Sequence, residues 1–250
     1  YTTLFRSEAF CDVHHFAGAS ADHVDELPAL GREAVGLKIY LDQTYGPLRI
    51  AGLPTLLACF RAWPRGKVIA FHAEGAGVAI AIGLAAAFDH RIHLCHVSRK
   101  SEIRLIAEAK RRGLPVTCEV TPHHLFLTER DLPRLGTFGE MKPPLAPPSD
   151  VEALWRHIDT VIDCVATDHA PHTVAEKQSD EAPPGVPGLE TALPLMLTAV
   201  DEGRLSLDRL VALMAANPRR IFGLPKQPDT WIEVDLDTDY TIPQQGLHAK

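Results

Sequence analysis

The chain has 250 residues, of which 46% are hydrophobic and 23% charged, the balance of a soluble globular protein long enough for one (β/α)₈ barrel. Its formal net charge of −7 excludes a basic nucleic-acid-binding surface as the main function. No apolar stretch is long enough to span a bilayer and the start lacks the order of a signal peptide, so we expect a cytoplasmic protein that does not enter a membrane.

Short apolar runs rich in β-branched residues alternate with longer segments whose apolar residues recur every three or four positions, as in KSEIRLIAEAKRRG. This alternation predicts βαβ units around a parallel sheet. About six units are present, so we expect an incomplete (β/α)₈ barrel made of about strands 3–8. Four of the five cysteines fall inside the runs, which predicts buried free thiols. The predicted strands lie in CDVHHFAGAS, VGLKIYL, KVIAFHAE, RIHLCHVS, PVTCEVTP and TVIDCVATDHA.

The last third of the chain contains a loop rich in Pro and Gly, two helical segments and a final stretch of different periodicity. The second helical segment should begin at Ser206, be interrupted at Pro218 and end at Gly223. The stretch TWIEVDLDTDYTIP alternates with period two and predicts the opening strand of another unit. We therefore divide the chain into a partial barrel at 1–228, without its first two strands, and a truncated β segment at 229–250.

Four polar residues stand at or near the downstream ends of four of the predicted strands: Lys38, His72, His96 and Asp168. Functional residues of a parallel barrel lie at the carboxyl ends of its strands, so we expect these four at one mouth. Imidazole and carboxylate ligands suit zinc and related divalent ions. A lysine joins such a site when its desolvated amine reacts with carbon dioxide, and the resulting carbamate can bridge two metals. The pattern predicts a two-metal hydrolytic site.

Each of these residues also has a simpler interpretation. Lys38 could be an edge residue whose stem packs on apolar neighbours, and a single histidine could belong to the core. The apolar flanks of Lys38 and the matching positions of the other residues favour the metal site. His93 and His96 should face opposite sides of one strand, so only one of them should be a ligand, and we choose His96.

The motif TDHAPH, which follows the last predicted strand, is the strongest local signal. Beside a metal ion, Asp168 could be a ligand and also accept a proton from water. Taken alone, Asp168 would be interpreted as a turn or helix-capping carboxylate. His172, placed beyond the rigid Pro171, could reach an anionic substrate.

The chain resembles the dihydroorotases, a family of zinc amidohydrolases, and most of all the dihydroorotase domain of the animal multifunctional pyrimidine-synthesis protein. The similarity extends over nearly the whole chain from Cys11 onward. It implies reversible, zinc-dependent cyclisation of N-carbamoyl-L-aspartate to L-dihydroorotate in pyrimidine biosynthesis. The motifs that carry it are GLKIYL, FHAE, HLCHVSRK, GLPVTCEVTPHHLFL, TDHAPHT, PPGVPGLET, EGRLSLD and NPRRIF.

The resemblance also implies roles for individual residues. Lys38 would be the carboxylated lysine that bridges two zinc ions, His72 and His96 ligands of one ion, and Asp168 a ligand of the other and the general acid and base. Cys95 and Glu119 would hold an additional zinc. The residues implied in substrate binding are Thr44, Tyr45, Lys142, His172, Pro184 and Gly185. A homo-oligomer, and association with aspartate transcarbamoylase or carbamoyl-phosphate synthetase domains, would also follow.

The chain departs from the family pattern in several places. Lys142 stands where relatives usually carry Arg or Asn, and Ala146 replaces a frequent Arg. The His-x-His pair of the family's first strand does not occur in the sequence. Because one zinc ion would then lack two protein ligands, we expect this chain by itself to be an inactive fragment.

Two alternatives remain at this point. A hydantoinase or dihydropyrimidinase would share the lysine, histidines and aspartate, although HLCHVSRK and TDHAPHT favour dihydroorotase. A dihydroorotase-like domain without catalytic activity could instead serve as a scaffold for aspartate transcarbamoylase. The presence of all four predicted ligands argues against that second alternative.

Overall fold

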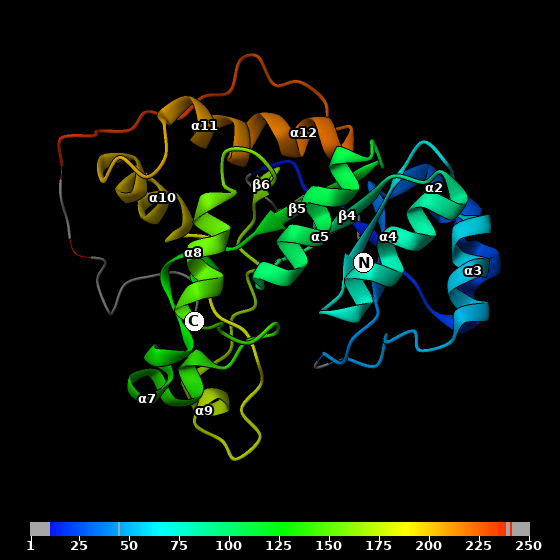
Figure 1. Ribbon diagram of the computed structural model, residues 1–250, viewed down its shortest axis with the longest axis horizontal. Coiled ribbons are helices and arrows are strands. Elements are labelled where there is room, and N and C mark those ends of the chain that lie inside the picture. Colours follow the sequence, from blue (N-terminus) through cyan, green and yellow to red (C-terminus); the bar gives the residue numbers. More distant parts are fainter. Residues whose placement is uncertain (1–10, 45, 239–240, 242–250) are drawn as a thin grey trace.

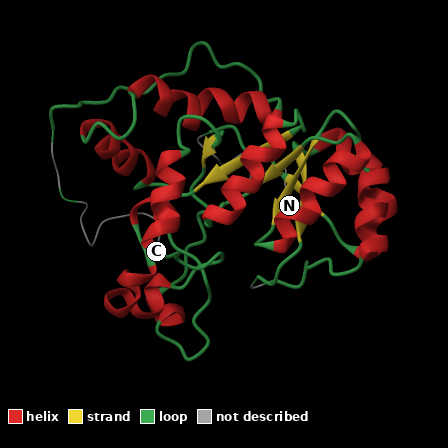
Figure 2. Ribbon diagram, in the orientation of Figure 1, coloured by secondary structure: helices red, strands yellow, loops and turns green. Residues whose placement is uncertain are grey.

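Six parallel strands form the centre of the molecule. The computed structural model describes residues 11–44, 46–238 and 241. The strands pair in chain order, β1-β2-β3-β4-β5-β6, as expected when each connection carries helices back over the sheet. All six predicted strands are confirmed, and Figure 2 shows them surrounded by helices. Their bounds are β1 Phe16–Gly18, β2 Gly36–Tyr40, β3 Val68–His72, β4 Ile92–Leu94, β5 Val116–Val120 and β6 Cys164–Val165.

The register of the sheet decides which side chains share its inner face. Lys38 on β2, Ala70 on β3 and His93 on β4 pair with one another in register. Two residues nearer the carboxyl ends, Tyr40 pairs with His72. Side chains alternate along a strand, so these residues lie on one face, and the residues between them, such as Ile39 and Phe71, pack in the core. The strand β3 is buried at all five positions, as expected for a parallel strand covered on both faces.

Helices follow each strand and pack against the sheet or against one another (Figure 1). The helix α5 shows why the sequence folds this way, because Ile103, Ile106 and Ala109 recur at helical spacing and are all buried. The helices that follow β1 to β5 are α2 Leu27–Glu33, α3 Leu53–Ala62, α4 Ala76–Phe88, α5 Lys100–Arg111, α6 Pro122–Phe126, α7 Leu132–Leu135 and α8 Pro148–Arg156. Those after β6 are α9 Val174–Lys177, α10 Ala192–Asp201, α11 Leu207–Val211 and α12 Asn217–Phe222. Four short connecting helices are Ala21–Glu26, Glu129–Asp131, Gly136–Gly139 and Ala212–Ala216.

The helical segment after Ser206 differs from the prediction in how it passes Pro218. The Ser206 hydroxyl accepts a hydrogen bond from the Arg209 N–H, as expected of an N-cap. The chain does not break at Pro218 but passes through a wide turn at Ala212–Ala216 before α12, which accommodates a residue without an N–H. Gly223, with φ of 65°, ends α12 in the left-handed conformation.

The predicted β segment at 229–250 is not a strand in its described part, 229–238. Trp231 and Ile232 are 74% and 71% exposed, and none of the described strands pairs with this stretch. A strand needs a partner for its backbone hydrogen bonds, so period-two alternation alone does not form one.

None of the described helices is long and apolar enough to cross a membrane. All five cysteines are free, and all but Cys11 are buried.

Candidate functional site

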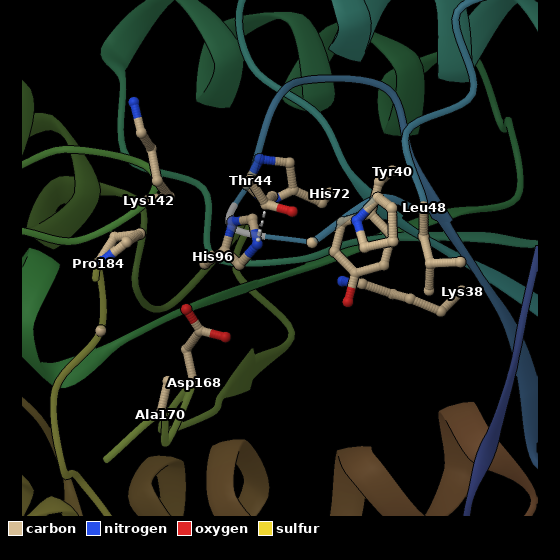
Figure 3. A pocket seen from close by; sticks show the side chains of 13 residues that line it. Lys38, Tyr40, Thr44, Leu48, His72, His96, Lys142, Asp168, Ala170 and Pro184 are labelled. Atoms are coloured by element: carbon tan, nitrogen blue, oxygen red, sulfur yellow. Dashed lines mark hydrogen bonds between the residues drawn. The ribbon is translucent and has the colours of Figure 1, made fainter. Parts of the chain in front are cut away.

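A cavity of about 290 Å³ opens at the carboxyl ends of the strands. Lys38, His72, His96 and Asp168 all line it, so the structure brings the four predicted ligands together (Figure 3). They come from β2, from the end of β3 and from the turns that follow β4 and β6. The other lining residues are Tyr40, Thr44, Gly46, Pro47, Leu48, Lys142, Ala170, Pro184 and Gly185.

The backbone is strained at two of these four residues. His96 has a φ of 36° and Asp168 a φ of 47°, and among the described non-glycine residues only Asp89 shares this property. Asp89 is the C-cap of α4, where a left-handed residue is ordinary. Strain at His96 and Asp168 has no capping explanation, and such residues concentrate at functional sites. The strain also determines direction: β4 ends at Leu94, and the turn at His96 brings the ring to the cavity.

The two histidines form a buried pair. The Nδ1 of His72 lies 2.9 Å from the Nε2 of His96, and the rings meet edge to face with centroids 4.6 Å apart. Of the two remaining nitrogens, both buried, Nδ1 of His96 makes no hydrogen bond, and Nε2 of His72 lies 3.6 Å from a Glu74 oxygen. Burial, with the nearby Lys38 charge, holds the pKa of His96 well below its usual value, so this ring is neutral, as a metal ligand must be.

Lys38 also contacts a second group of polar side chains, which lies deeper in the protein than the cavity. Its Nζ lies 3.0 Å from the Cys95 sulfur, and the Nε2 of His93 lies 2.9 Å from a Glu119 oxygen. Burial acts to lower the pKa of Lys38, but Cys95 and Glu119 outweigh it and the pKa is raised. Burial raises the pKa of the Cys95 thiol to about 12. His93 therefore also belongs to the inner face, against Glu119 and Thr117, and does not line the cavity.

Asp168 is exposed at the cavity, and the protein around its carboxylate removes part of its water. The resulting desolvation raises its pKa, and Lys38 partly opposes this shift. In Figure 3 the carboxylate is directed toward His96. A carboxyl group with a raised pKa at the wall of a cavity is suited to accept and return a proton.

Another part of the cavity wall comes from the loop after α9. Pro184 and Gly185 line it, and Gly185 has a φ of 139° that only glycine adopts readily. His172 is not among the lining residues: its Nε2 lies 3.2 Å from the Pro184 carbonyl oxygen, behind this wall. Lys142 is exposed at the rim, and its side chain runs away from the histidines in Figure 3. Thr44 lines the cavity, and Tyr45 lies outside the described residues.

Sequence reasoning missed Tyr40 as a cavity residue. Its ring lies 5.1 Å from the Lys38 Nζ and 5.8 Å from the His72 ring. The period-two alternation of β2 could have indicated it, because residues 38 and 40 must share a face.

In the described part of the chain, no three His, Cys, Asp or Glu side chains are grouped so that they could hold a metal ion.

Comparisons with known proteins place these features in a family. No protein-family model matches the chain. Over 248 residues the chain is 50% identical to the multifunctional protein CAD of Squalus acanthias, covering 99% of this chain and 11% of that protein. It is 42% identical over 178 residues to a dihydroorotase of Methanosarcina acetivorans, covering 68% of this chain and 38% of the relative.

A solved structure decides the family. The inactive dihydroorotase-like domain of a Chaetomium thermophilum CAD-like multifunctional protein matches with a TM-score of 0.83 and 32% identity, covering 98% of this chain and 70% of that domain. The chain belongs to the dihydroorotase family. The six-unit parallel sheet is accordingly part of a TIM-barrel amidohydrolase fold, as the sequence predicts. The chain spans 11% of the length of the shark relative, so the family is shown by the matched domain and not by the whole multifunctional protein.

Proposed function

We propose that this chain carries a dihydroorotase centre, which interconverts N-carbamoyl-L-aspartate and L-dihydroorotate by forming or cleaving one cyclic amide bond. The observation that carries the proposal is the meeting of Lys38, His72, His96 and Asp168 at one cavity. The Methanosarcina relative is named a dihydroorotase, and the chain is 42% identical to it.

We propose zinc as the metal of this centre, with His72, His96, Asp168 and a carbamate on Lys38 as the protein ligands. The buried Nδ1 of His96 supports this, because a nitrogen without a hydrogen bond is costly to bury unless a ligand satisfies it. The neutral amine of Lys38 would react with carbon dioxide, and the carbamate would add an anionic ligand to the two histidines and Asp168. A bound zinc ion would polarise the amide carbonyl and activate water.

The chain's own residues would bind substrate and move the proton. Asp168 would take a proton from the attacking water and deliver it to the leaving nitrogen, and would act in the opposite direction in ring closure. At the rim, the positive charge of Lys142 would bind a substrate carboxylate. The hydroxyl of Thr44 would donate a hydrogen bond to the substrate. His172, whose Nε2 lies 3.2 Å from the Pro184 carbonyl oxygen, would hold this wall in place, and the backbone around Pro184 and Gly185 would bind the ring amide.

An additional zinc ion at Cys95 and Glu119, with His72 shared, is part of the proposal. Cys95 lies directly beside Lys38. Burial acts to raise the pKa of Glu119, but the hydrogen bond and charge of His93, with the charge of Lys38, outweigh it and the pKa is lowered. A thiol with a pKa raised to about 12 gives up its proton only to a strong partner such as a metal ion.

The partners proposed are the other enzymes of the same pathway. Since the chain aligns with part of a multifunctional protein, we propose that it works beside aspartate transcarbamoylase and carbamoyl-phosphate synthetase domains, in a homo-oligomer. Size-exclusion chromatography with light scattering on the protein at its full natural length measures the oligomer, and a monomer would contradict it.

The test is a comparison of Asp168→Asn with Asp180→Asn in the protein at its full natural length. Asp180 is exposed and makes no described contact, so it controls for the loss of a carboxylate. The unaltered protein and Asp180→Asn should interconvert the two compounds, and Asp168→Asn should lose roughly 10²- to 10⁴-fold in kcat.

Zinc content is measured on the same samples. An unaltered protein that folds and binds zinc but has no activity in either direction would refute the proposal and favour a non-catalytic scaffold, like the inactive Chaetomium domain. A protein without zinc would refute the metal assignment.

A further inference from the structure

Lys177, at the end of α9, is a buried lysine whose ammonium group is fully used. Only 4% of the residue is exposed. Its Nζ donates to the carbonyl oxygens of Glu140, Pro183 and Gly185 at 3.0, 2.9 and 3.1 Å. An ammonium group has three N–H donors, and here each has its own backbone acceptor.

The three acceptors belong to the segments that build one wall of the cavity. Pro183 and Gly185 flank Pro184, which lines the cavity together with Gly185. The Gly185 N–H also donates to the Glu140 oxygen at 2.9 Å, so Glu140 and Lys177 bind this loop from two sides. Figure 1 shows α9 and α7, which precedes Glu140, in the same protrusion of the molecule.

The bridge between Val186 and His169 and the burial of Pro183 anchor parts of this loop, and Lys177 adds three hydrogen bonds to it and to Glu140. Residues 181–185 form no helix or strand, and Gly185 is in a conformation that strains any other residue. A carbonyl pointing into the protein needs a donor, and Lys177 supplies a charged donor to three of them at once. Without the Lys177 ammonium group, these carbonyl oxygens would turn toward water, and the backbone at Pro184 and Gly185 would shift with them.

We propose that Lys177 is a positioning residue, whose ammonium group fixes the Pro184–Gly185 wall and so sets the shape of the cavity against which substrate binds. This inference rests on the proposed function, in that the bound molecule is dihydroorotate or N-carbamoyl-L-aspartate. Lys177 itself touches neither the cavity nor the predicted ligands Lys38, His72, His96 and Asp168. Its removal should therefore weaken substrate binding while leaving the chemical step and the metal in place.

The experiment compares Lys177→Met with Lys226→Met in the protein at its full natural length. Lys226 is exposed and its side chain makes no described contact, so the control loses the same charge. Lys177→Met should raise KM for dihydroorotate about tenfold or more, with kcat within about threefold and zinc content unchanged. Lys226→Met should change neither constant. Equal KM values for the unaltered protein and Lys177→Met would overturn the proposal, as would loss of zinc together with kcat.

Hydrogen exchange provides a readout that does not depend on activity. Pro183 and Pro184 have no amide hydrogen, so the readout is the amides of Gly185 and Val186, which should exchange faster in Lys177→Met, while those of β2, β3 and β4 should be unchanged. If the unaltered protein proves inactive, the proposed function fails, and the exchange data still test the wall: unchanged rates at Gly185 and Val186 overturn it.

A second variant covers the case in which Lys177→Met does not fold. Lys177→Arg keeps the charge but replaces three diverging N–H donors by a planar fork, which cannot reach all three carbonyls. It should fold and raise KM in the same direction, and an unchanged KM would overturn the proposal.

Discussion

Replacing Glu102 with alanine should destabilise the domain by removing one buried carboxylate that joins two loops. One Glu102 oxygen accepts from the Gly75 N–H at 2.8 Å, and the other from the Ser98 and Arg99 N–H groups at 3.2 and 3.1 Å. Glu102 is 3% exposed. Gly75 belongs to the loop after β3 and Ser98 to the loop after β4, so the carboxylate ties together the two loops that follow the predicted histidine ligands.

The size of the effect follows from these three bonds and from what opposes them. Hydrogen bonds to a charged group contribute about 1.5–3 kcal/mol each, which would give roughly 5–9 kcal/mol for three. Burial of the carboxylate opposes this gain and raises the pKa of Glu102 despite the three N–H groups. The N–H of the exposed Gly75 can also reach water once released. We therefore expect Glu102→Ala to lower the free energy of unfolding by about 3 kcal/mol.

Urea unfolding followed by tryptophan fluorescence, to which the buried Trp63 contributes, measures this change. Glu152→Ala is the control, because Glu152 is an exposed helical residue whose carboxylate makes no described contact, and its stability should not change. Glu102→Ala should also bind zinc roughly tenfold more weakly, since the loops that follow the strands of His72 and His96 lose their connection. A loss of less than about 1 kcal/mol would show that water replaces the carboxylate without cost and would refute the reasoning.

Two further predictions concern the cavity wall and the dependence of stability on pH. In Gly185→Ala the new Cβ would lie 2.7 Å from both the Cβ and the carbonyl oxygen of Ala170, at a φ of 139°, so KM for dihydroorotate should rise. Steady-state kinetics would measure this change, with Gly66→Ala as the control, since a Cβ at Gly66 meets nothing within 4 Å. Equal KM values for the two variants would contradict the prediction. Burial lowers the pKa of His124 from 6.5 to about 4, so between these values the unfolded chain binds a proton that the folded chain does not, and stability falls as pH falls. Urea midpoints measured across this range should vary less with pH in His124→Gln, and an equally steep dependence in that variant would exclude His124 as a source.

Periodicity was sufficient to predict the strands and their order. Each strand run is short, apolar and bounded by turn residues, and parallel strands with helical crossovers leave few possible arrangements. The same reasoning failed for the stretch from Trp231 to Leu236, because its alternation describes a strand only if another strand pairs with it. Local patterns show which conformation a segment can adopt, and only the neighbours in space decide whether it does.

The site could be predicted as far as it depends on strand ends. Lys38 and His72 lie on strands, so their direction follows from the register and from alternation. The inner group around Cys95, Glu119 and His93 was harder to predict, since its contacts depend on which of two faces the whole sheet turns inward. We placed His93 on the face opposite His96 because we assumed that the strand continued. The strand ends at Leu94, so both histidines face inward at different depths.

The positions of His96 and Asp168 could not be predicted from periodicity, because each depends on a single residue of positive φ. Both residues follow a strand that has already ended, and both turn their side chains to the same cavity from there. An uninterrupted strand would have directed the His96 ring toward the helices, away from His72. For His96, the energy for holding a non-glycine residue in this conformation must come from the surroundings, here the loops tied by Glu102 and the buried pairing of the two histidine rings. Glu102→Ala should therefore affect zinc binding as well as stability, because the carboxylate holds the turn that brings His96 to the cavity.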